Sequence, residues 1–224
     1  MHEWEDVYSS GNQINLWPYT EILTRYRTHQ NKIKAGGVLN ILELGCGVGN
    51  NSKLFAGEGF SYFGVDFSET AIAFAKEKYE SDLVRFAVEN LELIEFDNDS
   101  YDLIFDRAAV THLESAKIKT LISKVSKALN SGGIYLGIDW FSTKHPEYQN
   151  SGSTAIDLND RTGFQTGKFR DIGTVHFSDR LWITEAFREL EILELIEGLS
   201  YDRLMESESI KAATWSVVAR KGMG

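Results

Sequence analysis

An apolar segment that passes directly into three alternating glycines constrains the fold of this chain more than any other feature of its sequence. The segment covers residues 41–44, and the glycines are Gly45, Gly47 and Gly49. Glycine takes positive φ angles without steric cost and lets another group approach the backbone closely. A buried strand that ends in such a turn, directly before a helix, is typical of a nucleotide-binding α/β unit, in which free backbone N–H groups face the ligand.

Alternating strand and helix patterns extend this unit through most of the chain. Amphipathic spacing predicts helices at Ser68–Tyr79, with Ser68 as N-cap, and at Lys117–Leu129, with Ser115 as N-cap and Gly132 as a stop signal. Near-continuous apolar runs between them indicate a parallel sheet that is covered on both faces. The runs that predict its strands are Val38–Leu44, Phe60–Val65, Leu83–Val88, Tyr101–Phe105 and Ile134–Ile138.

The last third of the chain has a different pattern. The apolar runs Glu191–Leu199 and Ala213–Ala219 have no helix between them that would allow a parallel crossover, so we expect an antiparallel pair at one edge of the sheet. The segment Phe141–Phe177 is polar and lacks a clear period, and a loop of that length is typically a mobile lid or a binding segment. We therefore expect one domain, divided into an N-terminal helical cap (1–37), a cofactor-binding core (38–140), a lid (141–178) and a C-terminal helix with strands (179–224).

The amino-acid composition limits the kinds of molecule that this chain is expected to bind. The chain has 23 Lys and Arg against 33 Asp and Glu, a net charge of −10. This balance argues against binding to nucleic acid or to anionic membranes, because both depend on dense basic clusters. Cys46 is the only cysteine, which excludes an internal disulfide and a Cys-rich zinc site, and we predict no metal. The acidic start and the absence of an apolar run of about 18 residues predict a cytoplasmic protein with no signal peptide or membrane span. The oligomeric state is not predicted.

An acidic residue on the second predicted strand indicates the kind of ligand. Asp66 stands where a carboxylate can accept hydrogen bonds from both hydroxyls of a ribose. The dinucleotide fingerprint needs a third glycine where this chain has Asn50 or Ser52, and the phosphate-binding loop that ends in Lys-Ser/Thr is absent. No Lys or Arg occurs within residues 35–52 to neutralise a pyrophosphate, whereas Glu43 suits a ligand with an amino group and a positive charge.

These residues resemble the class I S-adenosylmethionine-dependent methyltransferases. The family pattern (Asp/Glu)-x-Gly-x-Gly-x-Gly is complete at residues 43–49. Further on, residues 88–91 are similar to the adenine-binding segment and residues 100–106 to the fourth strand, whose end approaches the methionine. Residues 129–133 are similar to the Leu-(Lys/Arg)-Pro-Gly-Gly turn, with Ser131 in place of proline. The resemblance implies a doubly wound, mostly parallel seven-stranded α/β sheet with an antiparallel C-terminal strand pair, which is the Rossmann-like methyltransferase fold.

The resemblance also implies a cofactor, S-adenosylmethionine, which is released as S-adenosylhomocysteine. Asp66 matches the ribose-binding acid, and either Glu89 or Asn90 supplies the side chain that meets the adenine amine, while the next backbone N–H meets a ring nitrogen. The residues implied to contact the cofactor are Glu43, Gly45, Cys46, Gly47, Gly49, Asp66, Phe67, Glu89, Asn90, Leu91 and Asp106.

Methyl transfer is an in-line displacement, for which the protein holds the methyl acceptor close to the methyl group and excludes water. An alcohol acceptor gains from a general base, and an amine must be held deprotonated. His112 is the first candidate for this catalytic role and His176 the second, with Asp139 and His145 as further side chains near strand ends. The sequence Asp-Arg-Ala-Ala at residues 106–109 lacks the (Asn/Asp)-Pro-Pro-(Tyr/Phe) motif of enzymes that methylate amide or base nitrogens.

The expected walls of the site suggest the methyl acceptor. The N-terminal segment holds several aromatic residues, which suit a sulfonium through cation–π attraction; they are Trp4, Tyr8, Trp17, Tyr19 and Tyr26. The stretch Ser142–Gly173 is rich in hydroxyl and amide side chains, so we predict transfer to an O or N atom of a small polar metabolite or sugar. Two alternatives stay open. One is a reductase that binds a nicotinamide nucleotide, and the other is a partner subunit that binds S-adenosylmethionine without catalysis.

Overall fold

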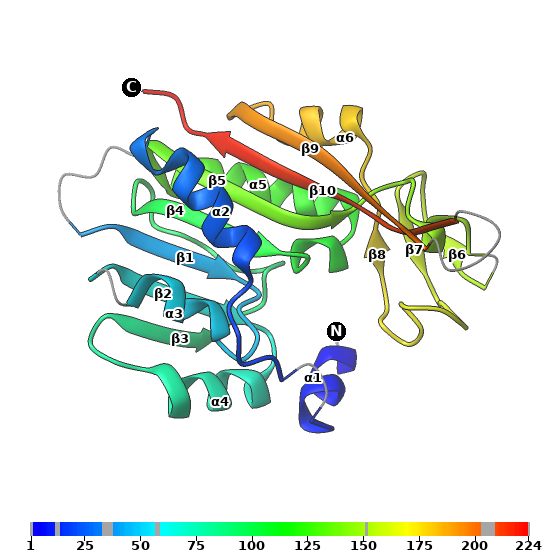
Figure 1. Cartoon of the computed structure of the whole chain (residues 1–224), viewed down its shortest axis with the longest axis horizontal. Helices are drawn as coiled ribbons and strands as arrows, with labels where there is room; N and C mark the ends of the chain where they lie inside the picture. Colours follow the sequence, from blue (N-terminus) through cyan, green and yellow to red (C-terminus); the bar gives the residue numbers. More distant parts are fainter. Residues whose placement is uncertain are drawn as a thin grey trace.

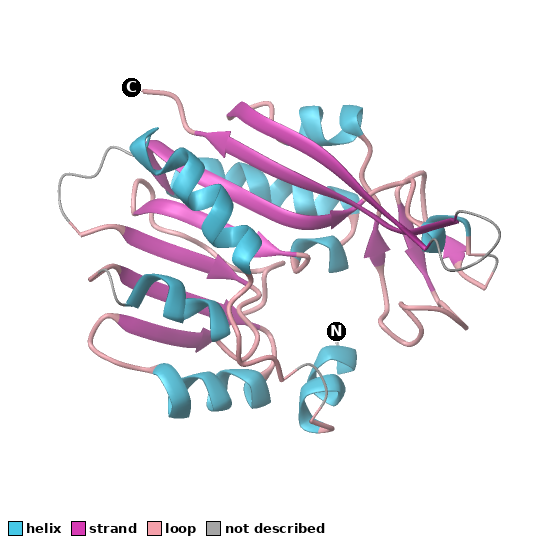
Figure 2. Cartoon of the chain, in the orientation of Figure 1, coloured by secondary structure: helices cyan, strands magenta, loops and turns pink. Residues whose placement is uncertain are grey.

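The computed structural model describes residues 2–11, 14–32, 38–56, 59–150, 152–202 and 209–223. Their strands form two sheets, a seven-stranded sheet with the order β3-β2-β1-β4-β5-β10-β9 and a three-stranded sheet with the order β6-β7-β8 (Figure 1). Helices lie on both faces of the larger sheet (Figure 2). This arrangement confirms the predicted doubly wound fold. Within the described residues, no helix has the length and apolar character needed to cross a membrane.

Five strands of the larger sheet run parallel, as predicted. The predicted Ile134–Ile138 is only the middle of a longer strand, in which the Gly132 turn lies as an irregularity. The pairing with the neighbouring strand shifts there, from Tyr101 opposite Leu129 to Leu103 opposite Ile134. The five strands are β1 (Asn40–Leu44), β2 (Ser61–Asp66), β3 (Val84–Val88), β4 (Tyr101–Arg107) and β5 (Leu129–Phe141).

The C-terminal strands form the predicted antiparallel edge. The last strand, β10 (Ser209–Arg220), lies between β5 and β9 (Glu191–Asp202) and runs antiparallel to both. Both strands are longer than the apolar runs that predicted them, and they continue past the sheet as a twisted ribbon (Figure 1). The ribbon ends at the three-stranded sheet, so the C-terminal edge reaches the same end of the molecule as the carboxyl ends of the parallel strands.

Two helical layers enclose the sheet. The helices α2 (Thr20–His29), α3 (Lys53–Ala56) and α4 (Glu69–Tyr79) pack on one face, and α5 (Ser115–Ala128) and α6 (Arg180–Ala186) pack on the other. Short 3₁₀ turns, η1 (Gln30–Lys32), η2 (Asn50–Ser52) and η3 (Val110–His112), complete these layers. The first helix, α1 (His2–Ser9), lies instead beyond the carboxyl ends of the strands, next to α4 (Figure 1). Residues 33–37, at the end of the predicted N-terminal cap, lie outside the described residues.

The predicted helix caps were right at one helix and wrong at the other. Ser68 precedes α4, and its Oγ accepts a hydrogen bond from the backbone N of Ala71 at 3.0 Å. At α5 the N-cap is Glu114, and Ser115 is already helical. The backbone N and Oγ of Ser115 both donate to the carboxylate of Asp160, at 2.8 and 3.1 Å. A carboxylate from a distant segment therefore replaces the local cap.

The segment expected to be a loop without regular structure is folded. It contains η4 (Pro146–Gln149) and the three-stranded sheet of β6 (Thr154–Ala155), β7 (Asp160–Thr162) and β8 (Val175–His176). We call this sheet the small sheet. It has its own apolar core, made of Phe141, Phe164, Phe169, Val175 and Phe177. The expectation of an irregular loop was wrong, because these core residues are widely and irregularly spaced in the sequence and leave no period to detect.

Candidate active site

The glycine loop, residues 45–49, joins β1 to η2 at the carboxyl end of the sheet. Gly45, Gly47 and Gly49 have φ angles of +69°, +52° and +75°, in the left-handed region that favours glycine. A Cβ at Gly45 would lie 2.2 Å from the Cβ of Ala109, so the loop after β4 packs directly against the backbone. Glycine is therefore required here by conformation and by close approach. Cys46 lies between these glycines with its thiol buried, and burial raises the pKa of that thiol.

Asp66, at the end of β2, holds the glycine loop in place. Its Oδ2 accepts from the backbone N of Gly47 at 2.8 Å, and its Oδ1 accepts from the backbone N of Ser68 at 3.0 Å. Burial raises the pKa of Asp66, although the hydrogen bonds from Ser68 and Gly47 oppose the rise. A carboxylate oxygen has two lone pairs, so each oxygen retains capacity for one more donor. The carboxylate can thus brace the loop and accept from a ribose at the same time.

Glu43 was expected to face the amino group of a ligand, but its side chain is turned into the protein. Its side chain is 2% exposed, its Oε1 accepts from Asn51 Nδ2 at 2.7 Å, and its Oε2 accepts from the hydroxyl of Tyr62. Burial raises the pKa of Glu43 to about 8, despite the hydrogen bonds from Tyr62 and Asn51. Asn51 also accepts from the backbone N of Tyr19 at 3.0 Å. Glu43 therefore links the strand to the N-terminal segment, which explains an acid at this position without contact to a cofactor.

The carboxylate of Asp106, at the carboxyl end of β4, is also occupied by the protein. Its Oδ1 accepts from the Tyr135 hydroxyl at 2.5 Å and from Trp140 Nε1 at 3.0 Å. Its Oδ2 accepts from the backbone N of Ala109 and Val110 at 3.1 and 3.3 Å. Burial raises the pKa of Asp106 to about 6, against these four hydrogen bonds. Four donors fill the carboxylate, so the structure gives this predicted cofactor ligand a role in shaping the loop after β4.

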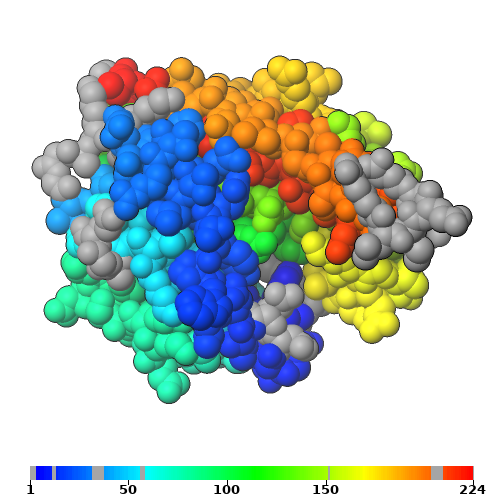
Figure 3. Space-filling view, in the orientation of Figure 1, coloured from blue at the N-terminus to red at the C-terminus, as the bar shows by residue number. Residues whose placement is uncertain are grey.

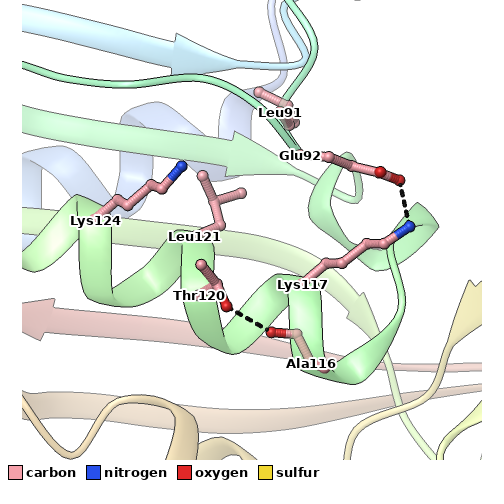
Figure 4. Close-up of a pocket in the computed structure, with 7 residues that line it drawn as sticks. All are labelled: Leu91, Glu92, Ala116, Lys117, Thr120, Leu121 and Lys124. Atoms are coloured by element: carbon pink, nitrogen blue, oxygen red, sulfur yellow. Dashed lines mark hydrogen bonds and ion pairs between the residues drawn. The ribbon is translucent and has the colours of Figure 1, made fainter.

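Beyond β3 the structure separates two residues that the sequence left as alternatives. Asn90 Oδ1 accepts from the backbone N of Glu92 at 2.9 Å and so closes its own turn. The Glu89 side chain is exposed and makes no hydrogen bond to a described residue, which leaves its carboxylate available to an adenine amine. The side chain of Leu91 faces α5, where it lines a shallow groove with Lys117 and Lys124 (Figure 4). Any contact of Leu91 with a cofactor would therefore be through its backbone. Phe67, next to Asp66, is half-buried.

The helix α1 supplies two of the aromatic residues that the sequence predicted as walls of the site, Trp4 and Tyr8, and one residue that it did not predict, Glu5. A Cβ at Gly47 would lie 2.6 Å from the Tyr8 hydroxyl, so this tyrosine lies directly over the glycine loop. Burial raises the pKa of Tyr8, and the nearby Asp66 raises it further. Glu5 accepts from Ser68 Oγ at 2.5 Å and anchors α1 to the start of α4. The signal in the sequence was the aromatic content of this segment, but only part of it reaches the site, because Trp17 is 79% exposed.

His112 lies under α1 on the side of the site formed by β4 and β5. Its ring makes an edge contact with Trp4, with centroids 4.9 Å apart, and its Nδ1 is buried without a hydrogen-bond partner among the described residues. Burial lowers the pKa of His112 to about 4, against a hydrogen bond with the Thr174 backbone, and repulsion from Lys168 adds to the lowering. The imidazole is therefore neutral at pH 7, with a lone pair on at least one nitrogen.

His176, the second candidate base, lies in the interior of the protein. It is 0% exposed, its Nδ1 is 2.6 Å from Asp160 Oδ1, and its Nε2 is 3.0 Å from Ser178 Oγ. Its ring also contacts Trp182, with centroids 4.1 Å apart. The position expected for His176, facing the cleft, is therefore wrong. With both nitrogens occupied, it ties the small sheet to the helices α5 and α6, through Ser115 and Trp182, and presents no group to a methyl acceptor.

Charged side chains complete the side formed by β4 and β5. Arg107 Nη2 lies 2.7 Å from Asp139 Oδ2, and the guanidinium lies 3.7 Å from the ring centroid of Tyr19. Asp139 has a φ of +57°, an unusual conformation for a residue other than glycine. His145 is further away, within the core of the small sheet, against Phe141 and Phe169. We call Tyr19, Arg107, His112 and Asp139 the acceptor side.

The glycine loop and the acceptor side face the same part of the molecule. Figure 3 shows a recess between the N-terminal segment, in dark blue, and the segment around the small sheet, in yellow-green. The side that contains the glycine loop suits a nucleoside-type cofactor. It offers glycine backbone that another group can approach closely, together with the carboxylates of Asp66 and Glu89. Within the described ranges, no group of three or more His, Cys, Asp or Glu side chains is placed to hold a metal ion.

Known sequences agree with this arrangement. A sequence model of the family described as "Methyltransferase domain" matches residues 41–133, which contain the glycine loop, Asp66 and Asp106. An uncharacterized methyltransferase of Bacillus cytotoxicus is 29% identical over 156 residues, 68% of this chain and 71% of the relative. An uncharacterized methyltransferase of Bacillus mycoides is 30% identical over 134 residues, 58% of this chain and 61% of the relative.

Solved structures share the fold over nearly the whole chain. A SAM-dependent methyltransferase from Methanosarcina mazei superposes with a TM-score of 0.69 at 19% identity, covering 89% of this chain and 99% of the other. An S-adenosylmethionine-dependent methyltransferase from Listeria monocytogenes, described as putative, gives a TM-score of 0.65 at 18% identity, with coverages of 89% and 99%. At these identities the likeness shows the fold, and it includes the C-terminal strands outside the matched domain.

Proposed function

We propose that this chain is a class I S-adenosylmethionine-dependent methyltransferase, and that it transfers the methyl group to an O or N atom of a small polar metabolite or sugar. The observation that supports this acceptor class is the acceptor side itself. Arg107, Asp139 and His112 bring hydrogen-bonding and charged groups to the carboxyl ends of β4 and β5, where doubly wound sheets place their ligands. A purely apolar acceptor would leave His112 Nδ1 without a partner.

Different residues of the site would bind the cofactor and exclude water. The backbone of the glycine loop and the carboxylates of Asp66 and Glu89 would hold the nucleoside part of S-adenosylmethionine, which supplies an electrophilic methyl group on a sulfonium. Tyr8 and Trp4, on α1, cover the loop and His112, and they would exclude water from the transfer. The part of the chain that binds the cofactor thus needs no catalytic side chain, because transfer depends mainly on position.

His112 is the residue we propose to receive the proton of the methyl acceptor. Its buried Nδ1 has no partner among the described residues, so it can accept a hydrogen bond from an acceptor O–H or N–H. With a pKa of about 4 the ring is already neutral at pH 7. Protonation would then follow the development of positive charge on an acceptor nitrogen, or the release of a proton from an acceptor oxygen.

The surface charge supports a small molecule over a polymer. With a net charge of −10, nucleic acid and anionic membranes are unfavourable partners, and we exclude them from the proposal. The single thiol, buried and with a raised pKa, fits a reducing compartment, so we place the protein in the cytoplasm.

The test is methyl transfer from labelled S-adenosylmethionine to a panel of hydroxylated and amino metabolites, read by mass spectrometry as added methyl groups. We expect transfer by the unaltered protein and a loss of about 100-fold or more in His112→Gln, in the range for a general base. His29→Gln is the matched control, because His29 is also a buried histidine with unpartnered nitrogens among the described residues, but lies in α2 beside Glu194. Binding of S-adenosylmethionine with no transfer to any class of acceptor would contradict the proposal and support a non-catalytic subunit.

A further inference from the structure

Two cations stand at the carboxyl ends of β4 and β5, and the first of them is fixed in position. Arg107 is the last residue of β4. Its ion pair with Asp139 and its stacking on Tyr19 hold the plane of the guanidinium. A guanidinium has five N–H donors, and the ion pair with Asp139 uses only one part of it. The remaining donors have no ion pair with a described residue, so they are available to a ligand.

The second cation, Lys168, is held over aromatic rings. It lies in the segment between β7 and β8, and its Nζ is 5.3 Å from the ring centroid of Phe141 and 5.5 Å from that of Phe169. Within the described part of the chain, no carboxylate oxygen lies within 4.0 Å of Nζ. Glu147, in η4, accepts instead from the backbone N of Lys168 at 2.9 Å and from Asn150 Nδ2 at 2.6 Å.

Lys168 lies close to the acceptor side. Its Nζ is 5.3 Å from the ring centroid of Phe141, and that ring in turn is 6.0 Å from the ring of His112. The positive charge of Lys168 lowers the pKa of both His112 and His145. Partial desolvation lowers the pKa of Lys168 itself and Arg107 adds to this effect, while Asp139 and Glu147 oppose it. Asp139 is already paired with Arg107, and Glu147 accepts from backbone and amide donors.

This local excess of positive charge is unusual for the chain. The protein carries 33 acidic residues, and several of its cations have a carboxylate within 3 Å; examples are Arg25 with Glu194, Lys124 with Glu95 and Lys221 with Asp99. The Lys168 side chain is exposed, and among the described residues its ammonium has ring contacts but no carboxylate, so it is accessible to an anionic ligand.

We propose that the methyl acceptor carries an anionic group, a carboxylate or a phosphate, which binds between Lys168 and Arg107. This inference rests on the proposed function, since it concerns the same site. An ammonium and a guanidinium both form charge-assisted hydrogen bonds with carboxylate and phosphate oxygens. The anion would complete the charge balance that Asp139 meets only in part, and it would hold the rest of the acceptor toward His112.

The experiment separates small metabolites by charge before the acceptor is known. A bacterial metabolite extract is divided on an anion exchanger into retained and unretained fractions, and each is incubated with the protein and methyl-labelled S-adenosylmethionine. We expect label only in the retained, anionic fraction. Treatment of that fraction with phosphatase then distinguishes the two anions, because a phosphate-bearing acceptor loses its activity and a carboxylate-bearing one does not.

Two lysine variants test the assignment. Lys168→Met should lower kcat/KM for the active fraction about 10- to 100-fold, as expected for the loss of a charge-assisted bond. Lys119→Met is the matched control, because Lys119 Nζ lies over Trp182 at 5.6 Å on the outer side of α5, and its activity should not change. The binding constant for S-adenosylhomocysteine should stay the same in both variants.

Each other outcome contradicts a defined part of the account. Label only in the unretained fraction would show a methyltransferase with a neutral or cationic acceptor, which overturns this inference and leaves the proposed function intact. Label in the anionic fraction with full activity of Lys168→Met would remove Lys168 from anion binding. Label in neither fraction, with S-adenosylhomocysteine bound, would contradict the proposed function and this inference with it.

Discussion

The glycine loop with Asp66 and the acceptor side face the same recess, but they differ in how their polar groups are satisfied. On the cofactor side, the carboxylates of Glu43, Asp66 and Asp106 all accept hydrogen bonds from within the protein, so the protein itself holds this half in place. On the acceptor side, His112 Nδ1 has no such partner among the described residues, and the adjacent Lys168 Nζ has ring contacts but no ion pair with a described residue. The difference indicates where ligand identity is recognised.

The two sides also differ in their origin along the chain. The cofactor side is mainly one continuous segment, residues 43–52, braced by a single carboxylate from the next strand. The acceptor side combines side chains from the N-terminal segment, from the ends of β4 and β5, and from the region of the small sheet. The cofactor side, which is made of consecutive backbone, can stay the same between related proteins while the acceptor side changes. One cofactor-binding fold can therefore serve many methyl acceptors. The predictions below test this separation, beginning with the largest effect.

The largest effect is expected from Gly47→Val, on the cofactor side. The residue has a φ of +52°, and a Cβ would lie 2.6 Å from the Tyr8 hydroxyl, so valine disturbs both the loop and the helix above it. We expect affinity for S-adenosylmethionine, measured by calorimetry, to fall more than about 100-fold. Gly59→Val is the control, because Gly59 has a φ of +73° with open space around it. Affinity within a few-fold of the unaltered protein would make Gly47 merely a turn residue.

Asp66→Asn should have the next largest effect. An amide has one carbonyl oxygen where the carboxylate has two acceptors, so it cannot keep both backbone bonds and both ribose bonds. We expect a loss of about 1.5–3 kcal/mol in binding, or about 10- to 150-fold in affinity. Asp102→Asn is matched to it, since Asp102 also accepts from a backbone N, that of Asn40, at 2.9 Å, but at the other end of the sheet. Equal affinities of the two variants for S-adenosylmethionine would show that Asp66 does not bind the ribose.

His176→Gln should have the opposite pattern of effects, with a loss of stability and little change in cofactor affinity. Loss of the bonds to Asp160 and Ser178 should lower the free energy of unfolding by about 1–3 kcal/mol, because buried groups are left unpaired. The affinity for S-adenosylhomocysteine should change less than about twofold, since the partners of His176 in the small sheet, α5 and α6 all lie outside the glycine loop. Chemical denaturation and calorimetry measure both quantities. A large loss of cofactor affinity would show that the small sheet supports the cofactor side as well.

The smallest effect is a dependence of stability on pH. Burial raises the folded-state pKa of Glu43 from its ordinary 4.5 to about 8, so the folded protein keeps a proton that the unfolded chain has released. The unfolding free energy therefore falls as pH rises through this range. Between pH 6.5 and 8, His112 and His145 act in the opposite direction. Their pKa is about 4 in the folded protein and 6.5 in the unfolded chain, so the unfolded chain releases protons over this interval that the folded protein does not hold. Asp106, at about 6, contributes little.

We expect a net decrease of about 1 kcal/mol over this interval, measured by denaturant unfolding. Glu43→Gln, which keeps an oxygen for Asn51, should abolish the decrease and leave the small rise that the histidines cause. An unfolding free energy that rises over the same interval in the unaltered protein would mean that Glu43 is ionised in the folded state.

The cofactor side could be predicted from the sequence, because its requirements are local. Positive φ angles at Gly45, Gly47 and Gly49, and a carboxylate at a strand end, leave a pattern at fixed spacing. The strands and helices of the core were predicted for the same reason, since burial on both faces gives continuous apolar runs. Even so, the pattern did not distinguish carboxylates that brace the loop, as Glu43 and Asp106 do, from carboxylates that remain open to a ligand.

The acceptor side could not be predicted, because its contacts join residues that are far apart in the chain. Asp160 replaces the local N-cap of α5, 45 residues away, and encloses His176 in the interior. The core residues of the small sheet come from the end of β5, from β8 and from the turns next to the short strands, so their spacing in the sequence is irregular. The sequence of this segment therefore resembled that of an irregular loop. Its closure over the methyl acceptor stays a prediction. The aromatic content of the N-terminal segment predicted Tyr8 as part of a wall of the site, whereas nothing in the sequence distinguishes Lys168 from the other residues of the predicted lid.

The central claim is that the glycine loop and Asp66 form a site for S-adenosylmethionine. Calorimetric titration of the unaltered protein with S-adenosylmethionine, S-adenosylhomocysteine and NAD in parallel tests it most directly. We predict saturable binding of the first two with one site per chain, and no heat of binding from NAD. Binding of NAD alone would contradict the claim, because it would make the glycine loop a dinucleotide site.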